Sequence, residues 1–119
     1  MPKIKPDIDQ WFDYPDDPYN GRVLVRLPRG GEVQRIVEQT TEYIAGPRVF
    51  RMNGTNEQII KAAIKDWEHF YDGEDQVLKC TPANVEVMCR DAAFLKFVDT
   101  CMAELRQRKA EQDKADLKN

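Results

Sequence analysis

Three cysteines and a single histidine are the side chains of this sequence best suited to metal binding or catalysis. Cys80, Cys89 and Cys101 are nine and twelve residues apart, and His69 is the only imidazole. A structural zinc site needs four such ligands, usually with two of them in a close cluster such as C-x-x-C. The sequence has no such cluster, so the spacing predicts no metal site and no bound cofactor.

A thiol–imidazole pair is the other chemistry that these residues offer. A cysteine nucleophile needs a nearby base, and Cys80 with His69 supplies the two residue types. Cys80, however, directly precedes a threonine–proline helix start, where an apolar side chain commonly packs. Cys89 and Cys101 fall on apolar helical faces and are expected to behave as small hydrophobes. The residues favour a protein that is not an enzyme, with a small cysteine-dependent enzyme or thiol sensor as an alternative.

Neither the carboxylates nor the glycines form a recognised ligand-binding motif. The acidic residues at 16–17 and 72–75 do not follow the D-x-D-x-D-G spacing that wraps a loop around calcium. Aspartate beside glycine or proline is ordinary turn chemistry. The glycine pair at 30–31 is not followed by the lysine and threonine of a phosphate-binding loop.

Composition narrows the class of protein further. The 119 residues fit one domain, with 41% apolar and 33% charged residues. The 18 basic and 21 acidic residues give a net charge of −3, which argues against a nucleic-acid-binding surface. No apolar run is long enough to span a membrane, and the first residues lack the apolar core of a signal peptide. An odd number of cysteines then indicates reduced thiols in a cytoplasm.

The N-terminal part reads as a β-hairpin. Residues 1–21 are rich in proline and aspartate, and the stretch DYPDDPYNG has the composition of a turn. Residues 22–27 form a short run rich in β-branched side chains, typical of a strand. We expect this run to pair with residues 8–14 across a long loop.

A helix and a brief strand are expected next. From Glu32 the apolar residues recur at helical spacing as far as Ile44, and Gly-Pro at 46–47 supplies a stop. Residues 48–52 then form a candidate third strand.

The clearest helix signal begins at Thr55. Residues 55–58, Thr-Asn-Glu-Gln, match a capping box, in which two side chains satisfy the free amides of the first helical turn. Apolar residues follow at helical spacing through Trp67 to Tyr71, and Asp-Gly at 72–73 supplies a stop. This pattern places Trp67 and Tyr71 in the core.

Two more helix starts follow. Thr81 with a proline after it predicts an N-cap, and Asp91 predicts the cap of the last helix. The apolar face of that last helix consists of Phe94, Leu95, Val98, Cys101, Met102 and Leu105.

The sequence therefore predicts an α+β fold with a small N-terminal antiparallel sheet, three to four helices and a projecting C-terminal helix. Residues 1–105 form a single domain, and residues 106–119 form a charged tail that is helical or flexible. Two groups are candidates for binding a partner protein, either as aromatic anchors or through charge. They are Trp11, Phe12 and Tyr14 in the proline-rich segment and Arg106, Arg108 and Lys109 in the tail.

The order of these motifs resembles the small tail assembly chaperones of long-tailed bacteriophages and prophages. The resemblance covers about residues 11–105. It lies in W-F-D-Y-P-D-D-P at 11–18, the strand at 23–27, D-W-E at 66–68, D-G at 72–73 and C-T-P-A-N at 80–84.

The resemblance implies a non-enzymatic role in the cytoplasm of the bacterial host. Such chaperones bind the tape measure protein, help recruit tail-tube subunits and leave before the tail is complete. A homo-oligomer is compatible with this role. A structural tail-completion or connector protein of the virion is the alternative within the same biology.

Overall fold

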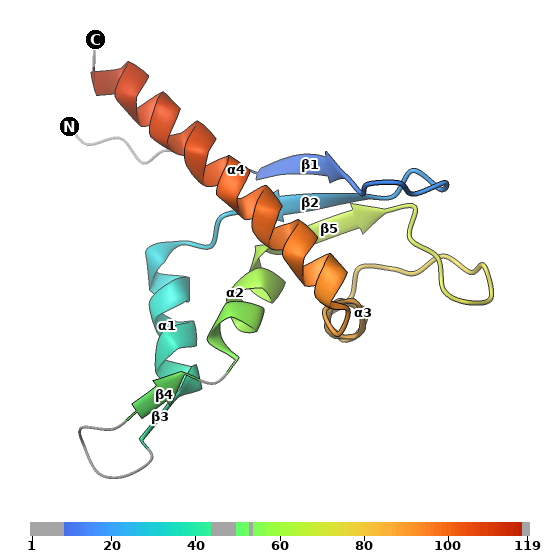
Figure 1. Ribbon diagram of the computed structural model, residues 1–119, viewed down its shortest axis with the longest axis horizontal. Helices are drawn as coiled ribbons and strands as arrows, with labels where there is room; N and C mark the ends of the chain where they lie inside the picture. Colours follow the sequence, from blue (N-terminus) through green and yellow to red (C-terminus); the bar gives the residue numbers. More distant parts are fainter. Residues whose placement is uncertain (1–8, 44–49, 53, 118–119) are drawn as a thin grey trace.

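The computed structural model describes residues 9–43, 50–52 and 54–117, which form an α+β fold (Figure 1). A three-stranded antiparallel sheet has the order β1 (Asp9–Asp13), β2 (Arg22–Arg26) and β5 (Ile64–Glu68). The long helix α4 (Ala92–Leu117) crosses one face of this sheet. The predicted fold class is therefore confirmed.

The central strand β2 organises the core. Val23 and Val25 are fully buried, while the residues between and beside them are half-buried. This alternation is what a strand with one face on the core should show. The hairpin expected from the sequence is confirmed, because β1 pairs with β2 over all five residues, from Asp9 with Arg26 to Asp13 with Arg22.

The third strand, β5, corrects the sequence prediction. The helix expected to run to Tyr71 ends at Ala63, and the chain continues as a strand. Ile64 pairs with Val25 and Trp67 with Val23, with a bulge between them. The extra residue of the bulge puts two side chains three positions apart on the same face of a strand. The same three-residue spacing also fits a helix, so the prediction of a helix through Trp67 to Tyr71 was wrong.

The first helix is also shorter than expected. Helix α1 (Gly30–Thr40) ends at two threonines whose hydroxyls donate hydrogen bonds to carbonyls of the preceding turn. Thr40 Oγ1 donates to the Ile36 carbonyl at 2.7 Å, and Thr41 Oγ1 donates to the Val37 carbonyl at 2.6 Å. Val37 is one of the last four residues of the helix, whose carbonyls a helix end leaves without partners, and the Thr41 hydroxyl satisfies it. Strand β3 (Thr41–Tyr43) follows and pairs with β4 (Phe50–Met52), a strand that the sequence predicted. The expected stop at 46–47 lies outside the described residues.

Helix α2 (Thr55–Ala63) begins differently from the predicted capping box. Its N-cap is Gly54 in the left-handed conformation, and Thr55 is already inside the helix. The Thr55 hydroxyl instead lies 2.6 Å from the hydroxyl of Thr40 and is largely buried. Because Thr55 lies inside the helix and its hydroxyl makes no capping bond, the capping-box prediction was wrong.

The last two helices start as predicted. Thr81 accepts a hydrogen bond from the Asn84 amide at the start of α3 (Pro82–Met88), and Asp91 accepts one from the Ala93 amide at the start of α4. The first half of α4 buries Phe94, Val98, Cys101, Met102 and Leu105. After Leu105 the helix continues to Leu117 and projects from the body (Figure 1).

Candidate functional site

The aromatic residues of the proline-rich segment fold back onto the domain. Phe12 and Tyr14 pack against the buried core. The Tyr14 ring lies 5.0 Å from that of Phe97, edge to face, and 6.1 Å from that of Phe94. Burial, helped by the nearby carboxylates of Asp91 and Asp17, raises the pKa of the Tyr14 phenol. Tyr14 therefore links the N-terminal hairpin to α4.

Trp11 has a different environment. It pairs with Leu24 of β2, whereas Phe12 pairs with the core residue Val23, so the two aromatic residues lie on opposite faces of the sheet. The Arg22 guanidinium lies 4.5 Å from the centroid of the Trp11 ring, a cation–π contact.

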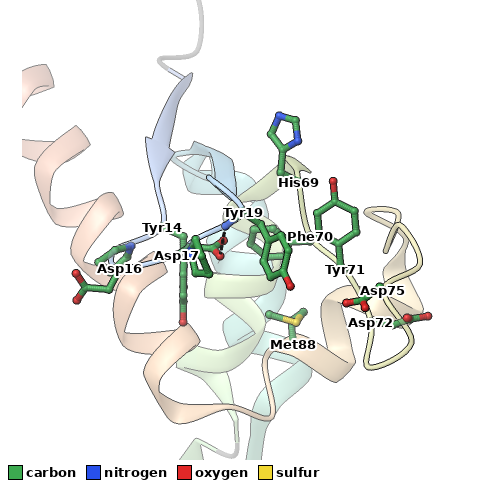
Figure 2. A pocket seen from close by; sticks show the side chains of 12 residues that line it. Tyr14, Asp16, Asp17, Tyr19, His69, Phe70, Tyr71, Asp72, Asp75 and Met88 are labelled. Atoms are coloured by element: carbon green, nitrogen blue, oxygen red, sulfur yellow. Dashed lines mark hydrogen bonds between the residues drawn. The ribbon is translucent and has the colours of Figure 1, made fainter.

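Tyr71 lies at the surface rather than in the core, which corrects the prediction. It remains 39% exposed, and Tyr19, which the sequence analysis did not single out, is 57% exposed. Their ring centroids lie 5.3 Å apart, although they come from two different loops. Between these loops is a pocket of about 300 Å³, the tyrosine pocket (Figure 2). Its lining residues are Tyr14, Pro15, Asp16, Asp17, Pro18, Tyr19, His69, Phe70, Tyr71, Asp72, Asp75 and Met88.

Aspartate side chains shape both loops of the tyrosine pocket. Asp17 accepts hydrogen bonds from the amides of Tyr19 at 3.0 Å and Gly21 at 2.9 Å. In the second loop, Asp72 Oδ1 accepts bonds from the amides of Glu74 at 2.8 Å and Gln76 at 3.0 Å. Such Asx turns mimic backbone turns and give short loops a defined shape.

The four non-glycine residues with left-handed backbone among the described residues also belong to these loops. They are Asp16, Asn20, His69 and Asp75, with φ between 56° and 60°. Asn and Asp adopt this conformation more readily than most residues, but for histidine it is uncommon. At His69 the backbone turns out of β5, so Phe70 enters the core while the imidazole points away from the rest of the pocket (Figure 2).

Cys80 and His69, the thiol and the imidazole considered as a pair, lie in different places. Cys80 lines a different hollow, beside Lys61, Ile64 and Pro82, while His69 lines the tyrosine pocket. Burial raises the pKa of the Cys80 thiol to about 11 and that of Cys101 to about 12. These thiols are therefore protonated near neutral pH. Within residues 9–43, 50–52 and 54–117, no three His, Cys, Asp or Glu side chains are grouped so that they could hold a metal ion.

A third hollow lies where α4 faces α1, α2 and the segment that connects β2 to α1. This α1–α4 groove has a volume of about 470 Å³. It is lined by Leu27, Pro28, Val33, Ile59, Met102, Arg106, Lys109, Ala110 and Asp113. Two of the three tail cations singled out from the sequence thus line one groove. The third, Arg108, binds Glu104 at 2.7 Å along the helix.

Helix α1 contributes an incompletely covered apolar face to this region. None of its residues is fully buried, and Val33, Ile36 and Val37 are only half-buried. Its N-terminus is held by Glu32, whose carboxylate accepts two hydrogen bonds from the Arg26 guanidinium, at 2.9 and 2.8 Å. The guanidinium lowers the pKa of Glu32 to about 2. An anchored helix with an apolar stripe left half-open is suited to receiving another apolar surface.

Comparisons with protein-family models, curated proteins and solved structures find no significant match. No helix among the described residues combines the length and the apolar character needed to cross a membrane.

Proposed function

We propose that this protein is a non-enzymatic assembly chaperone of a bacteriophage tail, which binds the tape measure protein in the host cytoplasm and helps recruit tail-tube subunits. The observation that supports binding as its activity is the α1–α4 groove. The choice of partner rests on the motif resemblance at residues 11–18, 66–68 and 80–84.

The groove has the chemistry to cover an apolar helix. Leu27, Val33 and Ile59 are half-buried and supply apolar contact, and Arg106 and Lys109 line the same groove from α4. An amphipathic helix can place its apolar face in such a groove, in the way that many helical peptides are recognised. Tape measure proteins, by the same resemblance, are long chains that must be kept soluble before assembly.

The test is co-expression with the tape measure protein of the same phage. Val33→Asp adds a charge to the groove, and we expect it to reduce both the soluble fraction and the co-purification of the tape measure protein. Val87→Asp is the matched control, because Val87 is 52% exposed on α3 and does not line the groove. Far-UV circular dichroism checks that both variants fold. Equal capture by wild type, Val33→Asp and Val87→Asp would refute the groove as the binding surface.

The alternative of a structural virion protein predicts a different fate for the chain. A tail-completion or connector subunit stays in the mature particle, whereas a chaperone leaves it. Mass spectrometry of purified particles separates the two, and stoichiometric amounts of this chain in the virion would overturn the chaperone proposal.

A further inference from the structure

We propose that the tyrosine pocket binds a cationic side chain, arginine or lysine, from an extended segment of a partner protein. The loops that form the pocket lie at one end of the three-stranded sheet, away from α1 (Figure 1). The described residues that line the pocket and those that line the α1–α4 groove are different. This second surface does not depend on the chaperone proposal.

The exposed tyrosine pair is the first observation. Tyr19 and Tyr71 come from separate loops and remain partly exposed, and their ring centroids lie 5.3 Å apart with the rings inclined by 52°. Their loops present ring surface that the core does not use. Ring faces attract guanidinium and ammonium groups, arginine most often.

Charge decides which ligand fits. Asp16, Asp17, Asp72 and Asp75 line the pocket, and its lining includes no lysine or arginine from the part of the chain that the structure describes. The backbone amides bound by Asp17 and Asp72 do not neutralise these carboxylates. A cation therefore gains from both the rings and the local field, whereas an anionic side chain is repelled.

The size and rigidity of the pocket suit one side chain. A volume of about 300 Å³ is at the small end of ligand pockets. The two loops are tied by backbone hydrogen bonds, from Tyr14 N to the Gly21 carbonyl at 2.8 Å and from Asp72 N to the Gln76 carbonyl at 2.9 Å. Pre-formed loops lose little entropy when a ligand binds, so even a small contact can give measurable affinity.

The experiment is an NMR titration of the ¹⁵N-labelled full chain with the blocked tripeptide Gly-Arg-Gly. The expected result is a saturable shift of the amides around Tyr19 and Tyr71 that weakens with added salt. The same tripeptide with citrulline, the uncharged counterpart of arginine, is the matched control and should cause little shift. Equal binding of the citrulline peptide, or shifts confined to other parts of the chain, would overturn the proposal.

Variants separate the contribution of the tyrosine rings from that of the carboxylates. Tyr71→Leu should raise the Kd for the arginine peptide about two- to fivefold, which corresponds to the usual strength of a cation–π contact at an exposed site. The double variant Asp16→Asn, Asp75→Asn keeps side chains that tolerate the left-handed backbone and should weaken it further. Asp99→Asn, an exposed change on α4, should have no effect. If diluting the protein alone shifts the same amides, the occupant is another copy of this chain, and the partner-segment proposal is wrong.

Discussion

The indole Nε1 of Trp67 donates a hydrogen bond to the backbone carbonyl of Leu78, with 2.7 Å between the two atoms. The same indole stacks on Phe70, with centroids 4.9 Å apart and an interplanar angle of 13°. Trp67 therefore links strand β5 to the loop that returns toward α3. The segment around His69 that carries so many reactive residue types is first of all a structural corner.

Replacing Trp67 should show this structural role. Trp67→Ala is expected to reduce the free energy of unfolding by about 3–5 kcal/mol, the range for removing a buried large aromatic side chain. Trp67→Phe should cost less, because it keeps a ring against Phe70 but loses the bond to Leu78. Urea denaturation measures both, and an unchanged midpoint in Trp67→Ala would contradict the burial of this residue.

Gly21 is required for close packing. A Cβ at this position would lie 2.9 Å from Cε1 of the buried Phe70 and would also meet the Asp17 carboxylate. Gly21→Ala should therefore destabilise the domain by about 1–3 kcal/mol, as overpacking usually does. The control is Gly31→Ala in α1, where a Cβ would meet no described atom within 4 Å and alanine favours the helix. A Gly21→Ala variant as stable as Gly31→Ala would contradict the packing.

The Arg26–Glu32 pair predicts a pH-dependent contribution to stability. Its carboxyl pKa is lowered from 4.5 to about 2 in the folded protein, so the pair stabilises the fold above pH 4.5. This contribution is lost as the pH falls from 4.5 through about 2, the pKa at which the folded carboxyl is half-protonated. The difference in urea midpoint between wild type and Glu32→Gln should shrink over that window. A difference that stays constant with pH would contradict the role of the ionised pair.

The thiol of Cys80 should react slowly. With a pKa of about 11, it carries little thiolate near neutral pH, and its alkylation by iodoacetamide should be slower than that of a free model thiol. Mass spectrometry with Cys80→Ser as reference assigns the modified residue. His69→Ala should leave the rate unchanged. Fast alkylation that disappears in His69→Ala would instead support the thiol enzyme or sensor.

Truncation after Leu105 separates folding from binding in the tail. Leu105 is fully buried, whereas Arg106, Arg108 and Lys109 are exposed, so the shortened domain should fold with nearly unchanged stability. It loses one wall of the α1–α4 groove, so capture of the tape measure protein should fall. Unchanged capture and stability would mean that the tail only aids solubility. A large loss of stability would move the boundary of the core beyond Leu105.

Local signals in the sequence determined much of this protein. The β-branched run of β2, the Thr81 and Asp91 helix starts and the apolar stripe of α4 each act over a few residues, and all appear in the structure. Such features depend on backbone propensity and on the periodicity of apolar side chains, and both are set by residues close together in the sequence. The α+β class and the projecting last helix followed from them.

Tertiary structure decided the rest, because the same local pattern is compatible with two different structures. Three-residue spacing between Ile64 and Trp67 fits a helix, yet pairing with β2 through a bulge buries both residues in a strand. Thr55 can cap its own helix, but Thr40 lies close enough to bind its hydroxyl. The tyrosine pocket needs two loops about fifty residues apart to meet, and that meeting depends on sheet pairing, which no local signal encodes.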